Sequence, residues 1–151
     1  MKRILVTGSN GQIGVELVPH LRKLYGAENV LATARRKVSG PVSEGGPFAL
    51  LEVRDGKAFS DVLGSFRADT VIHLAGVLSA KGEADPVASW DINVNGTCVA
   101  LEAARERGAA FFFPSSIAAF GPSTPSKNTP QDTIQRPTTV YGVAKVSMEL
   151  L

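Results

Sequence analysis

Two segments near the ends of the chain carry residue types whose spacing could do chemistry. A glycine loop from Gly8 to Gly14 directly follows the apolar run from Ile4 to Val6, so it connects a predicted strand to a predicted helix. Backbone N–H groups in such a loop can bind a pyrophosphate at the start of the helix. Near the other end, Tyr141 is followed four residues later by Lys145, a pair that can move a proton. Together the two segments indicate dinucleotide binding and proton-coupled hydride transfer, as in a nicotinamide-dependent oxidoreductase.

The glycines of the first segment are spaced as G-x-x-G-x-x-G, and each has a physical reason to be a glycine. Gly8 permits a tight turn, Gly11 lets backbone N–H groups approach a pyrophosphate, and Gly14 lets the helix pack on the strand. The loop residues that we expect to contact the cofactor are Gly8, Asn10, Gly11, Gln12, Ile13 and Gly14. The competing interpretation is an ordinary strand–turn–helix connection that is rich in glycine.

The end of the second predicted strand bears on the choice of cofactor. In NAD enzymes of this type an acid here holds the adenosine ribose hydroxyls, but the residues from 31 to 36 contain no acid. Ala34 cannot repel a 2′-phosphate, and Arg35 or Arg36 could bind one through two hydrogen bonds. The alternative is that both arginines are solvated loop charges. NAD and NADP therefore both stay open, with NADP as a hypothesis.

The tyrosine and lysine of the second segment suit general acid–base catalysis. Tyrosine has an ordinary pKa of about 10, too high for a base at neutral pH. On a helix, Lys145 shares a face with Tyr141, about 6 Å away at Cβ, so its ammonium can stabilise the phenolate and reach the nicotinamide ribose. Ser115 and Ser116, at the end of the fifth predicted strand, can hold a substrate oxygen. The alternative role for Tyr141 is packing at a helix start, and His73, inside an apolar strand, is interpreted as a core histidine.

The elements that must position these residues alternate between strand and helix. Strands are predicted over residues 3–6, 29–34, 48–53, 70–74 and 110–114, helices over 11–25, 57–66, 86–107 and from 137 onward, and loops over 39–47 and 121–136. This alternation predicts an α/β fold with a doubly wound parallel sheet (a Rossmann fold) in three layers, helix–sheet–helix. The expected strand order is 3-2-1-4-5.

Two helices carry more detailed expectations. The apolar face of the first is predicted from the side chains of Ile13, Leu17, Leu21 and Leu24. Asp85 and Pro86 are predicted as N-cap and first residue of the long helix over 86–107, which Gly108 ends. That helix is apolar on two sides, so we expect the sheet to cover one side and a second subunit the other, as in a homodimer.

Composition sets the broad class. The 151 residues (1–151) are expected to form one domain, and 44% hydrophobic residues suffice for a core. The net charge of +2 is small and its basic residues are scattered, which gives no support for a nucleic-acid or membrane partner. We expect no signal peptide, because Gly8 and Asn10 interrupt the first apolar run. With a lone Cys98 and two distant histidines, we expect neither a disulfide framework nor a metal site, and a cytoplasmic enzyme that acts on a small molecule.

With these residues in view, the whole chain resembles the extended short-chain dehydrogenase/reductases, also described as the NAD-dependent epimerase/dehydratase family. The resemblance is carried by the glycine loop, His73 to Gly76, Asn93 to Thr97, Pro114 to Ser116, and the Tyr141–Lys145 pair. Residues 78–83, 120–122 and 134–137 more specifically resemble the short-chain-type L-threonine 3-dehydrogenases.

The resemblance implies a role for each matching position. Tyr141 would be the general base, Lys145 its activator and a cofactor clamp, and Ser116 the catalytic hydroxyl, with Ser115 beside it. Ser79 would lie near the substrate. The further positions expected to line the cofactor are Arg35, Glu52, Val53, Leu74, Ala75, Gly76 and Asn93.

The chain departs from the family in two places. The family's NAD-binding acid falls at Ala34, so the resemblance does not decide between NAD and NADP. The sequence also ends ten residues after Tyr141, so we expect the amino-terminal part of an enzyme of roughly 310 residues whose smaller substrate lobe follows. The leading functional prediction is oxidation of L-threonine to 2-amino-3-ketobutyrate. The alternatives are a sugar-nucleotide epimerase or dehydratase, and a truncated, non-catalytic nucleotide-binding module.

Overall fold

The computed structural model describes residues 2–151, which form two compact units. The first, here called the sheet unit, contains residues 2–75 and Gly96–Pro114. The second, the helical unit, contains Gly76–Asn95 and Ser115–Leu151. The chain that was expected to form one domain is thus divided within its last two βα connections.

A five-stranded parallel sheet forms the centre of the sheet unit, in the order β3-β2-β1-β4-β5. Leu5 of β1 lies opposite Leu31 of β2 on one side and Val71 of β4 on the other. The strands are β1 (Ile4–Thr7), β2 (Val30–Ala34), β3 (Phe48–Leu50), β4 (Thr70–His73) and β5 (Ala110–Phe112). The predicted strand order is confirmed.

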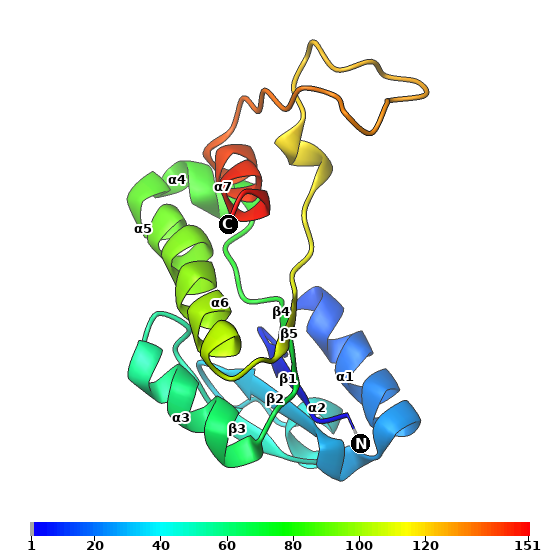
Figure 1. The fold of residues 1–151 in the computed structure, drawn as a ribbon, viewed down its shortest axis with the longest axis vertical. Coiled ribbons are helices and arrows are strands. Elements are labelled where there is room, and N and C mark those ends of the chain that lie inside the picture. Colours follow the sequence, from blue (N-terminus) through cyan, green and yellow to red (C-terminus); the bar gives the residue numbers. More distant parts are fainter. Residues whose placement is uncertain (1) are drawn as a thin grey trace. The chain divides into compact units, whose positions relative to one another are not determined.

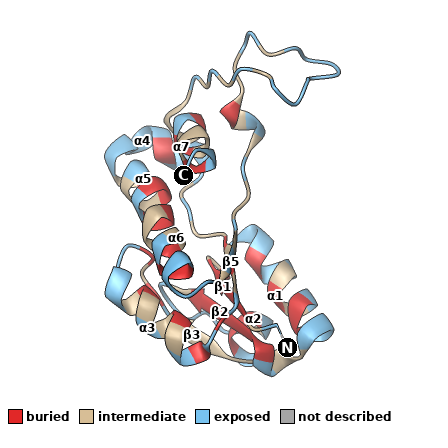
Figure 2. Ribbon diagram, in the orientation of Figure 1, coloured by how far each residue is buried: buried red, intermediate tan, exposed pale blue. Residues whose placement is uncertain are grey.

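Helices cover both faces of this sheet (Figure 1). On one face, α1 (Gln12–Tyr25) and α2 (Pro41–Glu44) pack on alternate strand residues, and the buried side chains are Ile4, Val6, Val18, Leu21, Val30, Ala32 and Val42. On the other face lie α3 (Gly56–Phe66) and α6 (Gly96–Glu106), with a larger core that includes Leu5, Leu31, Phe59, Leu63, Val71 and Ala100. Figure 2 shows the buried strands between these helix layers. The predicted three-layer α/β fold is therefore confirmed.

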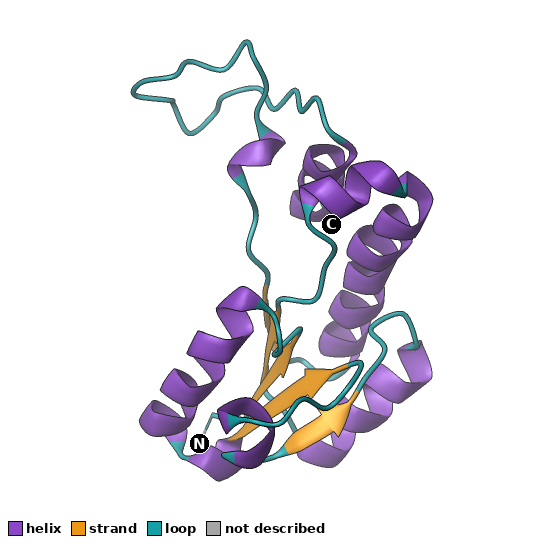
Figure 3. Cartoon of the chain, turned by 180° about the vertical axis from the view of Figure 1, so that it is seen from behind, coloured by secondary structure: helices purple, strands orange, loops and turns teal. Residues whose placement is uncertain are grey.

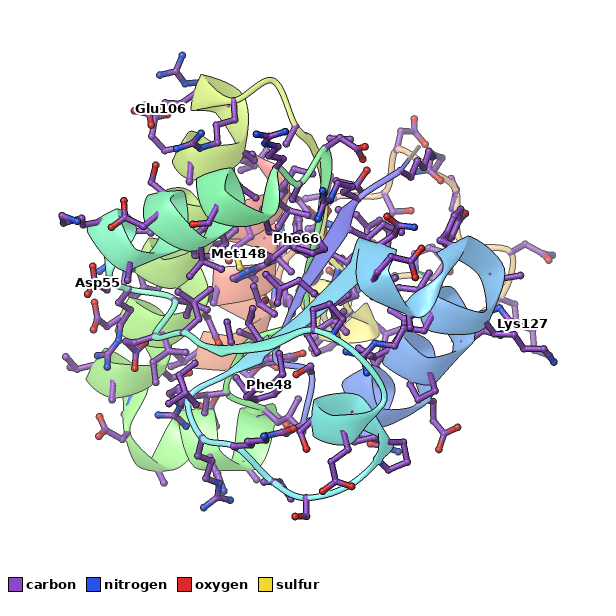
Figure 4. All side chains as sticks on the ribbon, turned by 90° about the horizontal axis from the view of Figure 1, so that it is seen from below. Phe48, Asp55, Phe66, Glu106, Lys127 and Met148 are labelled. Carbon is purple, nitrogen blue, oxygen red and sulfur yellow. The ribbon has the colours of Figure 1, made fainter. Side chains whose placement is uncertain are left out.

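Local sequence signals explain where these elements begin and end. The Asp55 carboxylate accepts a hydrogen bond of 2.9 Å from the Ala58 N–H and so caps α3. Figure 4 shows Asp55 at one end of this helix and Phe66 pointing inward from the other. A short 3-10 helix, η1 (Ala27–Asn29), leads from α1 into β2. The glycine predicted to end α6, Gly108, has a φ of +63°, which favours glycine.

Short helices make up the helical unit: α4 (Ser79–Ala84), α5 (Pro86–Trp90), a π-helical turn η2 (Asp91–Asn95), a 3-10 turn η3 (Ile117–Ala119) and α7 (Val140–Glu149). The last of these, α7, packs against the other four. Its Gly142 is required by close approach, because a Cβ there would overlap the Ala118 carbonyl. The connection between η3 and α7 is a long loop, as predicted (Figure 3).

The predicted apolar face of α1 is confirmed at Leu17 and Leu21, which pack on the core, and is wrong at Ile13 and Leu24. Ile13 and Leu24 are 55% and 60% exposed, whereas Gly14 and Val18 are buried together with Leu21. The cause is the close packing of Gly14, where a Cβ would lie 2.5 Å from the Ser9 carbonyl oxygen. Only a glycine can face the loop so closely, and this contact sets which side of α1 meets the sheet.

Other boundaries also differ from the sequence prediction. The helix expected over 86–107 divides into α5, the π turn η2 and α6. Strand β3 ends at Leu50 instead of 53, and the expected loop over 39–47 contains α2. The last helix begins at Val140 because the Thr139 hydroxyl accepts a hydrogen bond of 3.0 Å from the Gly142 N–H. Among the described residues, no helix is both long enough and apolar enough to cross a membrane.

Candidate active site

The glycine loop joins the carboxyl end of β1 to α1, and at Gly8 it packs so closely on neighbouring backbone that no side chain would fit. Gly8 has a φ of +63°, and a Cβ on it would lie 2.6 Å from the Ala75 nitrogen. Gly11 donates its N–H to the Gly8 carbonyl at 2.9 Å and forms the N-cap of α1, which has no side-chain cap. The exposed first turn of α1, which contains Gln12 and Ile13, therefore keeps N–H groups available for an anion. These features fit the pyrophosphate of a dinucleotide.

Polar side chains of the same loop hold the segment that follows β2. The N–H and the hydroxyl of Ser9 both donate to the Thr33 carbonyl, at 3.1 and 3.0 Å. The side-chain amide of Asn10 donates to the Arg36 carbonyl at 2.8 Å. The loop that would hold a pyrophosphate and the segment that would meet the adenosine ribose are thus fastened together within the sheet unit.

Two residues after β3, Glu52 and Val53, were expected to line the cofactor, and they differ in burial. Val53 is 5% exposed and packs beneath Gly96, where a Cβ would come within 3.0 Å of Val53 Cγ2. The Glu52 carboxylate pairs with Arg54, with an Nε–Oε1 distance of 3.1 Å. Hydrogen bonding to Arg54 lowers the pKa of Glu52, and the positive charge of Arg35 adds to the effect. Glu52 and Arg35 therefore belong to one charged cluster.

The segment after β4 is fixed by a threonine that sequence reasoning did not single out. The Thr7 hydroxyl accepts hydrogen bonds from the N–H groups of Leu74 and Ala75, at 3.1 and 3.2 Å. It also lies 3.0 Å from Nδ1 of His73, which is 3% exposed and stacks on Phe111. The interpretation of His73 as a core residue is confirmed. The only sequence signal for Thr7 was its place at the end of a buried strand.

Within the helical unit, Asn93 fixes the next part of the same connection. Its Oδ1 accepts the Val77 N–H at 2.7 Å, and its Nδ2 donates to the Val77 carbonyl at 3.0 Å. Asn93 is 3% exposed and lies in the π-helical turn, a geometry often found at functional sites. It also lies against Gly76, where a Cβ would come within 3.0 Å of Oδ1. Ser79 is exposed as the first residue of α4.

The two candidate serines have different partners. Ser116 is the N-cap of η3, where its hydroxyl accepts the Ala118 N–H at 3.2 Å. The Ser115 hydroxyl donates to the Glu149 carboxylate, and the other oxygen of that carboxylate accepts the Gln135 side-chain amide at 2.7 Å. The sequence analysis missed Glu149 and Gln135, because neither lies near Ser115 in the sequence.

A hollow of about 590 Å³ opens beside these serines. Its lining contains Ser115, Ser116, Ile117, Phe120, Gln131, Asp132, Thr133, Gln135 and Glu149. The wall combines hydroxyl, amide and carboxylate groups with apolar surface from Ile117 and Phe120, so it can accept a small molecule that carries polar groups.

The predicted tyrosine–lysine pair is formed on the first two turns of α7. The Lys145 ammonium lies 5.5 Å from the centre of the Tyr141 ring, so both side chains share a face of the helix. Burial lowers the pKa of Lys145, and the charge of Glu149 acts in the opposite direction. The Tyr141 N–H donates to the Glu83 carboxylate at 3.3 Å.

The structure therefore brings the predicted residues together in two groups. The sheet unit contains the glycine loop, Arg35, Glu52, Val53, Leu74 and Ala75. The helical unit contains Gly76, Ser79, Asn93, Ser115, Ser116, Tyr141 and Lys145. Within residues 2–151, no group of three or more His, Cys, Asp or Glu side chains could hold a metal ion.

A parallel sheet in the order β3-β2-β1-β4-β5 with a glycine loop after β1 defines a dinucleotide-binding α/β fold. Residues 4–151 match the sequence model of the NAD dependent epimerase/dehydratase family, and the chain belongs to this family.

Individual relatives agree with this assignment. The chain is 53% identical over its whole length to an uncharacterized epimerase/dehydratase of Staphylococcus saprophyticus, of which it covers 48%. A solved L-threonine dehydrogenase from Clostridium difficile is 51% identical, with a TM-score of 0.96 over 99% of this chain and 47% of that one. A UDP-glucose 4-epimerase from Thermotoga maritima is 27% identical, with a TM-score of 0.88 over 98% of this chain and 49% of that one. The chain thus spans about half the length of these relatives.

Proposed function

We propose that this chain is the cofactor-binding part of an enzyme that oxidises the β-hydroxyl of L-threonine to give 2-amino-3-ketobutyrate. The observation that carries the proposal is the likeness to the Clostridium difficile L-threonine dehydrogenase, at 51% identity and a TM-score of 0.96. A second dehydrogenase of this kind, from Trypanosoma brucei, is 41% identical with a TM-score of 0.95, over 99% of this chain and 47% of that one.

The chemistry follows from the residues of the helical unit. Tyr141, as the phenolate, would accept the proton of the substrate hydroxyl, and Lys145 would stabilise that phenolate. The Ser116 hydroxyl would donate a hydrogen bond to the oxygen that becomes a carbonyl. When bound, a nicotinamide dinucleotide, NAD or NADP, supplies the acceptor for the hydride. The glycine loop would hold its pyrophosphate through N–H groups at the start of α1.

A second candidate function is epimerisation of a sugar nucleotide. It is favoured by the 27% identity to a UDP-glucose 4-epimerase, whose polar substrate would also suit a hydroxyl-rich wall. A substrate screen separates the two. In the intact protein, the absorbance of reduced cofactor should rise with L-threonine and should not rise with UDP-glucose.

The role of Tyr141 is tested in the same assay. Tyr141→Phe removes the proton acceptor and keeps the ring, so kcat should fall about 100-fold or more, the usual scale for a lost acid–base group. Tyr25→Phe, on α1, is the matched control and should leave kcat within twofold. Full activity of Tyr141→Phe would remove this residue from the mechanism, and absence of any threonine-dependent reduction would reject the proposed reaction.

We also propose that the intact protein forms a homodimer through the helical unit. The support is apolar surface on one short helix, where Val87 is 81% exposed and Trp90 is 38% exposed. Exposed apolar side chains that cluster in this way usually mark an interaction surface. Sedimentation of the intact protein at micromolar concentration should give a dimer, and a monodisperse monomer would contradict this.

A further inference from the structure

The end of β2 lacks the group that would recognise an unphosphorylated adenosine ribose. The strand ends at Ala34, which pairs with Leu50 and accepts the Leu51 N–H at 3.0 Å. In a dinucleotide-binding sheet an acid at this point accepts hydrogen bonds from the ribose 2′-hydroxyl, and the same acid repels a 2′-phosphate. A methyl group does neither. The position therefore gives no selectivity for NAD and no barrier to NADP.

Two arginines follow directly, on backbone that is held in place. Asn10 binds the Arg36 carbonyl at 2.8 Å, and Ser9 binds the Thr33 carbonyl twice. Because these partners belong to the glycine loop, the backbone that carries Arg35 and Arg36 has a fixed position beside the loop that would hold the pyrophosphate. A pyrophosphate and a ribose 2′-phosphate belong to one molecule, so this geometry suits a ligand that carries both.

The charges of this segment are available to a ligand. Arg35 and Arg36 are exposed, and among the described residues neither guanidinium has a hydrogen bond or ion pair. The nearby Glu52 carboxylate is engaged by Arg54 through two contacts, Nε–Oε1 at 3.1 Å and Nη2–Oε2 at 3.2 Å. Arg54 thus pairs with a carboxylate whose pKa the charge of Arg35 also lowers.

From this arrangement we propose that Arg35 and Arg36 bind the 2′-phosphate of NADP, and that the protein prefers NADP to NAD. Guanidinium groups bind a phosphate through paired, charge-assisted hydrogen bonds. The inference rests on the proposed function only for the use of a nicotinamide dinucleotide, and it does not depend on which alcohol is oxidised. It also differs from the cofactor named in the description of the family.

A binding titration tests the preference without any turnover. The intact protein is titrated by calorimetry with 2′,5′-ADP and with 5′-AMP, and then with NADP and NAD. 5′-AMP and NAD lack the 2′-phosphate and so cannot make the charged contact with the arginines. We therefore expect 2′,5′-ADP and NADP to bind at least tenfold more tightly, because one hydrogen bond to a charged group changes the affinity by about this factor. The difference should shrink as salt is raised, because the arginines are exposed.

Three variants show whether the two arginines and Ala34 are responsible. The double variant Arg35→Ala, Arg36→Ala should lose most of the preference by weakening NADP binding about tenfold or more, with NAD binding changed less than twofold. Ala34→Asp should move the preference toward NAD, because the new carboxylate accepts the ribose hydroxyl and repels the phosphate. Lys37→Ala, which removes the next cation of the same segment, is the control and should keep the preference of the unaltered protein.

The outcomes separate this inference from the proposed reaction. Tighter binding of NAD than of NADP, or equal weakening of both ligands in the double variant, would overturn the role of the arginines and leave threonine oxidation standing. NADP preference without threonine-dependent reduction would support the cofactor assignment and reject the reaction. If neither dinucleotide binds, both are rejected.

Discussion

The Oγ1 atom of Thr7 lies 3.0 Å from Nδ1 of His73, a contact between the end of β1 and the end of β4. The same hydroxyl accepts two N–H groups, from Leu74 and Ala75. The His73 ring nitrogen is therefore the third polar group that this one hydroxyl contacts. One buried hydroxyl thus joins the end of β1 to the backbone that leaves β4.

Removing the Thr7 hydroxyl should destabilise the connection between β1 and the backbone that follows β4. Thr7→Val keeps the shape of the side chain but leaves two half-buried N–H groups and the buried Nδ1 atom without this partner. We expect the free energy of unfolding to fall by about 2 to 3 kcal/mol, the cost of unsatisfied buried polar groups. Urea denaturation measures this, and dinucleotide affinity should fall as well, because Leu74 and Ala75 are expected to line the cofactor.

Two further variants make this test specific. Thr7→Ser keeps the hydroxyl and should recover most of the stability. Thr70→Val removes a hydroxyl whose partner is the exposed Asp69 carboxylate, so it should change stability by less than about 0.5 kcal/mol. If Thr7→Val and Thr70→Val lower the free energy of unfolding equally, the hydrogen bonds of the Thr7 hydroxyl do not contribute to stability more than those of an exposed hydroxyl.

The carboxylate of Glu149 should control the alkaline limit of activity. Burial lowers the pKa of Lys145, and the negative charge of Glu149 partly offsets this. If the ammonium form supports catalysis, kcat/KM falls as pH rises through this pKa, earlier than for an exposed lysine. Glu149→Gln removes the opposing charge, so the pKa of Lys145 should fall further and the alkaline limb should move to lower pH.

The pH–rate profile of the intact protein measures this shift. The glutamine oxygen can still accept the Ser115 hydroxyl, so the substitution removes only the charge and the hydrogen bond from the Gln135 side-chain amide. Glu44→Gln, an exposed carboxylate on α2, is the control and should leave the profile unchanged. If the alkaline limb of the Glu149→Gln profile stays at the pH of the unaltered protein, the charge of Glu149 does not affect the pKa of Lys145.

The buried guanidinium of Arg22 should be a major source of stability in the sheet unit. Arg22 is 7% exposed and has only backbone acceptors, the carbonyls of Pro41, Val42, Pro47 and Val30, at 3.0, 2.8, 2.7 and 3.4 Å. Arg22→Met would remove these hydrogen bonds, while the Pro41 and Pro47 carbonyls would keep the N–H groups of Gly45 and Ala32, so we expect a loss of about 1 to 3 kcal/mol. Lys23→Met, the exposed neighbour, should change stability by about 0.5 kcal/mol or less in the same denaturation experiment.

The sequence was sufficient where a residue's own type determines the local structure. Gly8 and Gly108 adopt the positive φ that turns require, and Asp85 caps α5 through the Ala88 N–H at 3.1 Å. Short apolar runs predicted every strand of the sheet, because parallel strands that are covered on both faces are apolar almost throughout. The alternation of strands with helices then predicted the strand order.

What depends on distant partners could not be predicted in this way. The buried position of Arg22 depends on carbonyls of a loop about 20 residues away, and a charged residue in a helix usually predicts an exposed face. Similarly, the contact of Ser115 with Glu149 joins residues that are 34 positions apart. Such contacts are set by tertiary packing, so no spacing rule within one element reveals them.

Asn93 offers the sharpest test of how the connection after β4 is held. Its amide satisfies both polar backbone groups of Val77, inside a buried setting. Asn93→Ala leaves both groups without a partner, so unfolding should become easier by about 2 to 3 kcal/mol. Asn93→Asp keeps the acceptor for the N–H but sets a carboxylate against the Val77 carbonyl, so it should not restore stability. Asn95→Ala is the control, because it removes an exposed amide paired with Asp91 at 2.9 Å, and it should leave the free energy of unfolding nearly unchanged. If Asn93→Asp is as stable as the unaltered protein, the hydrogen bond that Asn93 donates to the Val77 carbonyl contributes nothing to stability.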